Sequence, residues 1–472
     1  MESWKYMKWF SGNKSADSYR TKEDNRAFYR DMFKIALPVA LQNIISYSVN
    51  LTDTVMLGKL GEIALSAASL ANQVFFVFTA VCTGVSGGAV VLSSQYWGKR
   101  DVASIQKVTT IAVKIMALVS ALFTALVLFF PRQLMQIYSN ELQVIDAGVD
   151  YLRVVALSYL FYGLSSVLLI ILRSVETVRI SVYVSIVSFL LNILFNYIFI
   201  FGKWGAPVMG VAGAAVGTLI ARFVELVMVL FYLLLRDQKI QYRLSMLRCK
   251  SPALFRDLLR YGLPVMIGEF LTALGTTGHS VVLGHLGATV VAANSICLVV
   301  FQMATSMIVG LGGASAIYIG KAVGLGDRAF VNSRVAKLER FYLLTGIVFC
   351  LVILLIRRPV IAFYPIEEET KAVALQLMVA YAVMAFFRAF TVPMTSGILR
   401  GSGDTRFAMI TDVCSLWFSC LTGAFAAFVL HLPVIGVFVC LKLDMPLRGI
   451  ASFIRLRGDR WIKDVTQQNS TT

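Results

Sequence analysis

The sequence has little charge, and it has no motif of an enzyme that uses a nucleotide, an activated serine or a metal. Only 15% of its 472 residues are Asp, Glu, Lys or Arg, whereas 58% are hydrophobic. A Walker A motif, a GxSxG motif and a metal-binding spacing of Cys and His are all missing. The composition excludes an ordinary soluble domain of this length. The missing motifs indicate a protein that is not an enzyme, has no catalytic residues and does not draw its energy from ATP.

A disulfide framework and a cleavable signal peptide are also missing. The seven cysteines form no CxxC pair and most lie within apolar runs, so we interpret them as small hydrophobic residues. The first 30 residues are polar and of mixed charge, unlike a signal peptide. We therefore expect the first apolar run to direct membrane insertion itself.

Long apolar runs are the main feature that is present. Runs of about 20 residues, which can cross a hydrocarbon core of about 30 Å, recur along the whole chain. The predicted fold is an all-α membrane protein with twelve transmembrane helices. They are expected at residues 33–57, 65–92, 104–131, 147–172, 179–201, 207–235, 254–283, 290–318, 336–357, 373–399, 407–430 and 432–454.

The first half of the chain repeats in the second half, 226 residues later. Ala36–Asp101 aligns without a gap with Gly262–Asp327, with 17 identities in 66 positions, five of which are paired glycines. An even number of helices in each half makes the repeat parallel, and many alternating-access transporters place the substrate path between two such halves. We predict two pseudo-symmetric six-helix lobes. The predicted segments are an N-terminal segment 1–31, an N-terminal lobe 32–235, a linker 236–253, a C-terminal lobe 254–457 and a tail 458–472.

The net charge of +17 is concentrated in alternate connections between the apolar runs. The positive-inside rule therefore places both termini and the 236–260 loop in the cytoplasm of a multi-pass plasma-membrane protein. A nucleic-acid partner is not expected, because the basic segments lack interleaved aromatic residues. Five basic residues are interpreted as cytoplasmic anchors against anionic lipid and not as a substrate site: Lys99, Arg100, Arg173, Arg400 and Arg406.

Several short motifs, in order and at the expected helices, resemble those of the multidrug and toxic compound extrusion (MATE) transporters. The resemblance covers about residues 32–457. The motifs are Leu37-Pro38, Asn50-Leu51-Thr52-Asp53-Thr54-Val55-Met56-Leu57-Gly58, Gly98-Lys99-Arg100-Asp101, Gly210-Val211-Ala212-Gly213-Ala214-Ala215 and Leu399-Arg400-Gly401-Ser402-Gly403-Asp404-Thr405-Arg406. The resemblance implies a twelve-helix antiporter that exports organic compounds, often cationic, against an inward flow of Na⁺ or H⁺, with no other cofactor.

Asp53 is the first candidate for ion coupling. A carboxylate about twenty residues into an apolar helix is costly unless it is paired or protonated. One interpretation is a proton or cation site, because desolvation favours the protonated carboxyl whereas oxygen partners favour bound Na⁺. The alternative is a solvated residue near the extracellular helix end.

Three neutral polar residues are candidate partners of Asp53. Asn192 and Asn196 share a face of the fifth helix at i, i+4, and Thr218 on the sixth helix offers a hydroxyl. The two asparagines could instead be interhelical hydrogen-bond partners. The resemblance implies that the set forms the family's N-lobe cation site, a possible Na⁺ site. Some members carry a second Asp where Asn196 stands, which leaves Na⁺ or H⁺ open.

The repeat provides an internal comparison for this set. Asp53 aligns with His279, and the helix equivalent to the fifth offers only Ser415 and Ser419 near the asparagine positions. Structural hydrogen bonds should be similar in the two lobes, whereas an ion site need occur in only one. The asymmetry favours ion binding in the N-terminal lobe.

The C-terminal lobe offers a candidate substrate or second proton site at Glu269, His279 and, through the repeat, Asn43. Glu269 aligns with Asn43 and should face a cavity or a partner, for which Arg388 is a candidate. One branch of the resembled family has its functional Glu about one turn later, where this chain has Thr272. His279 could titrate near neutral pH, although a packing role is more usual. Asp412 is interpreted as a cytoplasmic helix cap.

The resulting hypothesis is a monomeric secondary antiporter that exports organic compounds, expected to be cationic or amphiphilic, in exchange for H⁺ or Na⁺. A lipid-linked precursor flippase of the same superfamily is the alternative; it would need extra helices and a basic central cavity, whereas the basic residues are assigned to cytoplasmic loops. A passive pore is disfavoured by the duplication with buried acids, and a membrane enzyme by the missing motifs.

Overall fold

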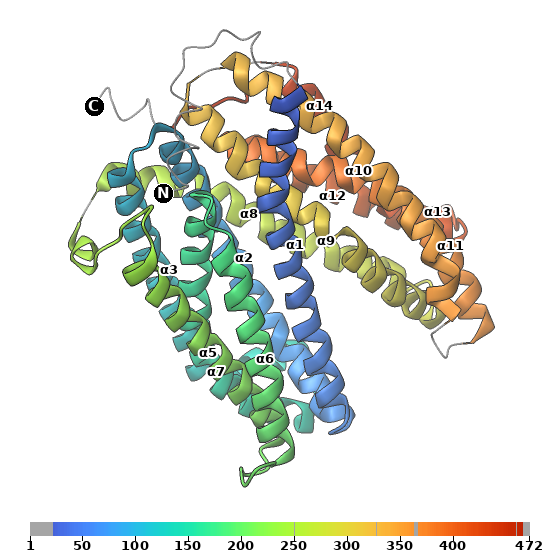
Figure 1. The fold of residues 1–472 in the computed structure, drawn as a ribbon. Coiled ribbons are helices and arrows are strands. Elements are labelled where there is room, and N and C mark those ends of the chain that lie inside the picture. Colours follow the sequence, from blue (N-terminus) through green and yellow to red (C-terminus); the bar gives the residue numbers. More distant parts are fainter. Residues whose placement is uncertain (1–21, 250, 327, 363–366, 459, 466–472) are drawn as a thin grey trace.

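The computed structural model describes residues 22–249, 251–326, 328–362, 367–458 and 460–465, and these residues form helices without any strand. Figure 1 shows two lobes that lie against each other at one end and diverge toward the other. We call the end at which α1 (Lys22–Gly58) begins and α14 (Asp444–Leu456) ends the terminal end, and the opposite end the far end. The predicted all-α, two-lobed fold is confirmed.

The N-terminal lobe contains the first six predicted spans. Its helices are α1, α2 (Glu62–Lys99), α3 (Val102–Phe129), α4 (Pro131–Tyr138), α5 (Leu142–Ser174), α6 (Arg179–Phe201) and α7 (Gly210–Phe231), and a π turn, η3 (Tyr232–Arg236), follows α7. The eight-residue helix α4 was not predicted, because it is too short to produce an apolar run. The connection to the second lobe holds a short 3₁₀ helix, η4 (Leu244–Arg248).

The C-terminal lobe contains the other six spans. Its helices are α8 (Pro252–Gly284), α9 (Ala288–Gly324), α10 (Arg328–Ala362), α11 (Glu368–Val392), η5 (Pro393–Leu399), α12 (Thr405–Phe428), α13 (Val434–Leu441) and α14. The last predicted span, 432–454, is divided between α13 and α14, which are joined at Lys442-Leu443. Ten helices among the described residues are long and apolar enough to cross a membrane. The remaining two predicted spans are α8, which carries buried Asp257 and His279, and the divided α13–α14.

The paired glycines of the repeat lie where the lobes meet. A Cβ added to Gly84 in α2 would overlap Met266 of α8, and one added to its repeat partner Gly310 in α9 would overlap the Ala36 carbonyl oxygen of α1. The pair Gly98 and Gly324 lies against backbone of the other lobe in the same manner. Glycine therefore allows α1 to cross α9 and α2 to cross α8 at backbone contact, as small residues do between membrane helices.

Polar contacts also join the lobes at the terminal end. Lys321 at the end of α9 forms an ion pair of 2.5 Å with Glu176, which follows α5. The side chain of Gln95 in α2 donates to the Lys463 carbonyl oxygen and accepts from the Val465 amide of the C-terminal segment. The lobes are thus held together at this end and separate toward the far end.

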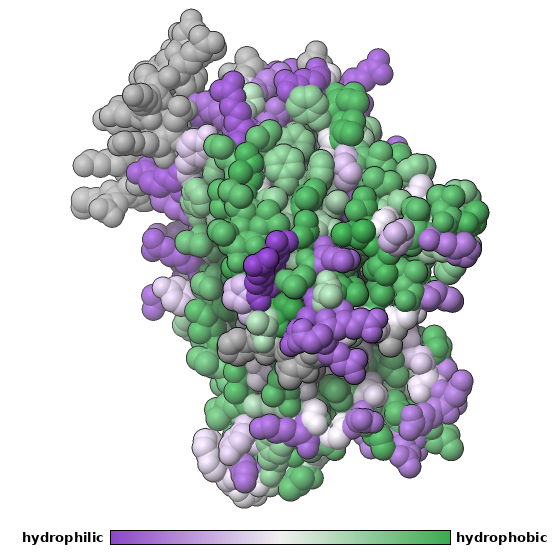
Figure 2. Space-filling view, turned by 90° about the vertical axis from the view of Figure 1, so that its right-hand side faces the viewer, coloured by the Kyte–Doolittle hydropathy of each residue, from purple (hydrophilic) through white to green (hydrophobic). Residues whose placement is uncertain are grey.

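The surface matches a membrane-embedded bundle. Figure 2 shows hydrophobic side chains over much of one face, with hydrophilic side chains at its top and in smaller groups across its middle and lower parts. Large apolar side chains such as Leu118, Leu122 and Leu355 are more than 60% exposed, which is expected of residues that contact lipid.

Candidate functional site

Asp53 lies in the far-end half of α1, five residues before the helix ends at Gly58, and its side chain is half-buried against α6. Its Oδ1 accepts a hydrogen bond of 2.5 Å from the Asn196 Nδ2. Asp53 is therefore directed at a neutral amide inside the lobe, not at the solvated helix end of the alternative interpretation.

The hydrogen bonds continue from Asn196 to the third helix of the group. The Asn196 Nδ2 also donates to the Asn192 Oδ1 at 3.3 Å, and the Asn192 Nδ2 donates to the Thr218 Oγ1 at 3.3 Å. The four predicted residues thus form one connected chain across α1, α6 and α7, which we call the Asp53 cluster (Asp53, Asn192, Asn196, Thr218).

Local sequence explains how three helices bring these side chains together. Asn192 and Asn196 are one turn apart on α6 and both are buried. A Cβ added to Gly217 would overlap the Asn196 Oδ1, and one added to Gly213 would overlap the Phe199 backbone. This small-xxx-small spacing brings α7 close enough to α6 for Thr218 to contact Asn192.

One polar atom of the cluster has no partner. The Asn196 Oδ1 is buried and accepts no hydrogen bond from the described residues. A buried acceptor without a donor costs about 1–3 kcal/mol, so it marks a place where a ligand can compensate. A carboxylate, two amide oxygens and a hydroxyl are hard ligands that suit Na⁺, and the same carboxylate can take up a proton.

A second charged group in this lobe was not predicted. Arg222 on α7 forms a 2.7 Å ion pair with Glu225, whose Oε1 accepts a 2.8 Å hydrogen bond from Ser165. The Arg222 guanidinium also lies 4.8 Å from the centre of the Tyr162 ring. Arg222 follows Thr218 by four residues and so shares its helix face. The i, i+3 spacing of Arg222 and Glu225 within an apolar run could have indicated this pair.

The equivalent position in the C-terminal lobe has different chemistry. The His279 Nε2 lies 3.1 Å from the Ser419 Oγ, and both side chains are buried. This contact joins α8 to α12 as the Asp53–Asn196 contact joins α1 to α6. The two lobes therefore use repeat-related positions for a hydrogen bond, but only the N-terminal one contains a carboxylate.

Glu269 is paired with Arg400, so the predicted partner Arg388 is wrong. The Arg400 Nη1 lies 2.8 Å from the Glu269 Oε1, and its Nη2 lies 3.0 Å from the Asp412 Oδ2. Arg388 instead lies 5.4 Å from the centre of the Phe301 ring. The sequence could not distinguish the two arginines, because both are far from Glu269 along the chain.

The interpretation of Asp412 as a helix cap is wrong. Asp412 is part of a buried ion network. It lies inside α12, which begins at Thr405, and it pairs with Arg400 and with Arg448 at 3.5 Å. Arg448 also pairs with Asp444. Asp412 therefore links α12 to α14 directly through Arg448, and to α8 through the Arg400 that it shares with Glu269.

The other predicted C-lobe residues do not form one site. Glu269 is paired with Arg400 and His279 with Ser419. The Asn43 Nδ2, on α1, is buried and has no hydrogen-bond partner in the described part of the chain. The three predicted residues thus belong to separate local environments.

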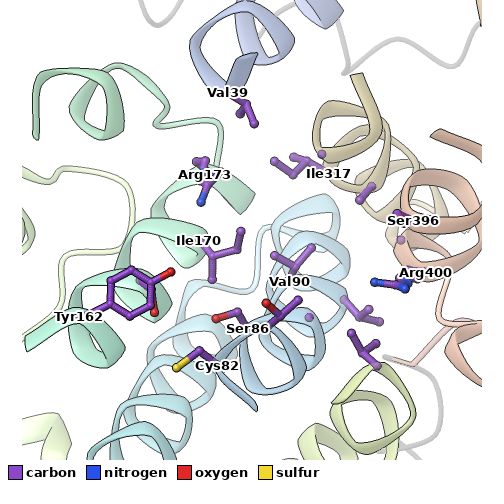
Figure 3. Close-up of a pocket in the computed structure, with 18 residues that line it drawn as sticks. Val39, Cys82, Ser86, Val90, Tyr162, Ile170, Arg173, Ile317, Ser396 and Arg400 are labelled. Carbon is purple, nitrogen blue, oxygen red and sulfur yellow. The ribbon is translucent and has the colours of Figure 1, made fainter. Parts of the chain in front are cut away.

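A cavity of about 280 Å³ lies where the two lobes meet, and residues of both lobes line it. Val39, Gly87, Val265 and Gly313, from the four helices that cross there, form part of its wall. Figure 3 shows Arg173 and Arg400 on opposite sides of this central cavity. The interpretation of these two arginines as lipid anchors is therefore wrong.

The chain is similar to known transporters over most of its length. The MatE family model matches residues 38–198 and 264–425, and the second match begins 226 residues after the first, as the internal repeat does. A probable multidrug resistance protein NorM of Thermotoga maritima is 26% identical over 94% of this chain and 96% of its own length. The multidrug resistance protein NorM of Burkholderia vietnamiensis is 29% identical over 82% of this chain and 84% of its own.

A solved structure has the same fold. The outward-facing conformation of a multidrug resistance MATE family transporter superposes with a TM-score of 0.83 and 19% sequence identity, over 90% of this chain and 94% of that one. This likeness concerns the arrangement of helices in two lobes.

Proposed function

The chain belongs to the MatE family, a family of multi-pass membrane transporters for multidrug efflux, and from this premise we propose that it is a secondary antiporter driven by H⁺ or Na⁺. In this proposal the ion binds at the Asp53 cluster, and organic compounds leave through the central cavity between the lobes. In this proposal the protein lies in the cell membrane and both termini are on the cytoplasmic side, as the charge distribution favours.

The observation that carries the proposal is the asymmetry between the lobes. Asp53 contacts Asn196 next to a buried oxygen without a partner, whereas the repeat-related contact of His279 with Ser419 contains no carboxylate. A carboxylate among neutral oxygens inside a membrane helix is costly and is a functional site by default.

Helix α1 is the element that can connect the ion to the drug path. Asp53 lies near its far end, while Ala36 and Val39 in its middle contact α9 of the other lobe and Val39 also lines the central cavity. Pro38 within α1 removes one helical hydrogen bond and is a natural point of bending. An ion that favours one bend of α1 would favour one arrangement of the lobes, without touching the drug.

The arrangement of the lobes supports an outward-facing state in this proposal. The lobes contact each other at the terminal end, assigned to the cytoplasm, and diverge toward the far end (Figure 1). A compound in the central cavity would then be released outside, and the opposite tilt of the lobes would load it from inside.

A flippase for lipid-linked precursors is kept as the second candidate. One of the two sequence arguments against it was that basic residues are assigned to cytoplasmic loops, whereas Arg173 lines the central cavity. Efflux of water-soluble dyes without lipid movement would favour the exporter.

Transport in proteoliposomes tests the proposal. A pH gradient and a Na⁺ gradient are imposed separately, and movement of cationic, zwitterionic and anionic fluorescent dyes is followed in each. The proposal predicts uphill, saturable dye movement opposite to one of the two ion gradients. Movement that only follows the dye's own gradient would show a passive pore instead.

A further inference from the structure

The central cavity is basic and contains no carboxylate. The eighteen described residues that line it include two arginines and no Asp or Glu, and most of the others are apolar or carry a hydroxyl. An organic cation would find no counter-charge on this lining. The electrostatics of the cavity therefore differ from those expected for a cationic substrate.

Only one of the two arginines has an uncompensated charge. Arg400 forms ion pairs with Glu269 and Asp412, so its charge is neutralised inside the C-terminal lobe. Arg173 has no ion pair with any described residue, and its Nε is buried without a hydrogen-bond acceptor. The carboxylate nearest to it in sequence, Glu176, is paired with Lys321 across the lobes.

The unpaired guanidinium of Arg173, with its buried Nε, needs a source of stabilisation. Arg173 lies in the last turn of α5, where the helix dipole stabilises a cation. The dipole does not supply an acceptor for the buried Nε, and a buried donor of a charged group is costly without one. The missing stabilisation can come from an anionic group in the cavity, since Arg173 points into it (Figure 3).

We propose that the central cavity binds amphiphilic organic compounds through an anionic group, a carboxylate or phosphate, that pairs with Arg173. The hydroxyl of Ser86 and the ring of Tyr162 line the same space, and the apolar side chains Val90 and Ile170 would contact the hydrophobic body of the compound. This inference rests on the proposed exporter and names its substrate class. Arginine suits the task because its planar fork matches two oxygens of one anion.

Two xanthene dyes provide a matched test, because they share one ring system and differ in one group. Rhodamine 110 carries a free carboxylate, and rhodamine 123 is its methyl ester. Binding of each dye to the purified full-length protein in neutral detergent is measured by fluorescence anisotropy. We expect the wild-type protein to bind rhodamine 110 about tenfold more tightly, since a hydrogen bond to a charged group is worth at least one factor of ten.

Substitutions of Arg173 assign the preference. Arg173→Gln should weaken rhodamine 110 binding about tenfold, to the level of rhodamine 123, and leave rhodamine 123 binding unchanged; Arg173→Lys should keep part of the preference. The matched control is Arg179→Gln, which removes the same charge from an exposed position at the start of α6, outside the cavity lining. Unchanged rhodamine 123 binding also reports that the Arg173 variants are folded.

The source of the anion is resolved by competition. Short-chain phosphatidylglycerol and phosphatidylcholine are added to bound rhodamine 110. Displacement by the anionic lipid alone would identify a lipid headgroup as the anion. Displacement by neither lipid would exclude these headgroups and leave a soluble anion as the source of the Arg173-dependent preference.

The inference is overturned if wild-type protein binds both dyes equally or prefers the ester, or if Arg173→Gln and Arg179→Gln behave alike. Failure of the exporter proposal has a different signature. Arg173-dependent binding without ion-driven movement of either dye would reject the exporter and keep the anion site. Ion-driven movement of both dyes, bound with equal affinity, would keep the exporter and reject the anion site.

Discussion

Asn196 donates both hydrogens of its side-chain amide, one to Asp53 and one to Asn192, while its oxygen is left without a donor. A single side chain thus orients the carboxylate and leaves an oxygen without a partner beside it. The buried ion pairs of the C-terminal lobe have the opposite character, because every carboxylate in the Arg400 network has a cationic partner. At the scale of residues, the Asp53 carboxylate is hydrogen-bonded by a neutral amide, whereas the carboxylates of the Arg400 network are paired with arginines.

Replacing Asn196 distinguishes the two coupling ions. Asn196→Ser removes a hydrogen bond to a carboxylate, worth about 1.5–3 kcal/mol, together with the free amide oxygen. If Na⁺ is the coupling ion, the Na⁺ concentration for half-maximal efflux should rise about tenfold. If H⁺ is the coupling ion, losing the donor favours the protonated carboxyl, so half-maximal efflux should move to higher pH.

The control for this variant is Asn294→Ser, which removes the amide that accepts a 2.8 Å hydrogen bond from Tyr381 in the other lobe. Its ion dependence should equal that of the wild type. An Asn196→Ser protein with unchanged Na⁺ and pH dependence would remove Asn196 from the ion site.

Replacing Arg400 should lower the free energy of unfolding more than replacing an exposed arginine. Arg400→Gln leaves Glu269 and Asp412 without their shared cation, and breaking a buried pair costs about 3–5 kcal/mol. We expect a clear drop in the unfolding temperature of the detergent-solubilised protein. Arg457→Gln, which breaks the exposed pair with Glu339, should cost about 1 kcal/mol or less. Equal effects of the two substitutions would contradict the assigned network.

At the scale of elements, α1 and its repeat counterpart α8 each cross a helix of the opposite lobe at a glycine of that helix, Gly310 of α9 and Gly84 of α2. The repeat conserves Gly84 with Gly310 and Gly98 with Gly324 because each allows backbone contact between lobes. Of the other three pairs, Gly87 and Gly313 face Val265 and Val39 of the opposite lobe, and the remaining two have different surroundings. Gly58 and Gly284 have open space around them, and Gly61 and Gly287 have φ angles of +110° and +111° at the starts of α2 and α9, a conformation that favours glycine.

A substitution at the crossing should separate the lobes at the terminal end. Gly84→Val places a side chain where Met266 lies, so α2 and α8 can no longer approach as closely. Spin labels at Lys107 and Leu325, exposed positions on the two lobes, should move apart by several ångströms in a pulsed electron-spin measurement. Gly58→Val is the matched control, because nothing lies within 4 Å of its added Cβ. An unchanged distance in Gly84→Val would mean that this crossing does not determine the lobe arrangement.

At the scale of the whole molecule, the net charge of +17 comes from basic residues in the connections between helices and from others, such as Arg173, that line the central cavity. The sequence alone predicted the long helices, because a run of about twenty apolar residues satisfies its backbone hydrogen bonds in a bilayer by forming an α-helix. It missed the division of the last span, where Lys442 and Asp444 interrupt the apolar run. It assigned Arg173 and Arg400 to the lipid surface, since a position at a helix end does not reveal which way a long side chain points.

The Asp53 cluster was predictable for a specific reason. Asn192 and Asn196 share a helix face by spacing alone, and the repeat supplied His279 as a control for Asp53. The partners of Glu269 and Asp412 were not predictable, because Arg400 and Arg448 reach them from elements whose packing the sequence does not give. Local periodicity identifies side chains on one helix face, whereas pairs between distant helices need the fold.

The central claim is that ion energy enters through the carboxylate of the N-terminal lobe, and paired substitutions at the two repeat-related positions test it most directly. Asp53→Asn and His279→Asn are reconstituted in proteoliposomes, and dye efflux is measured under the gradient that drives the wild-type protein. The account predicts that Asp53→Asn abolishes gradient-driven efflux while still binding dye, and that His279→Asn retains it. Gradient-driven efflux by Asp53→Asn at the wild-type rate would contradict the account.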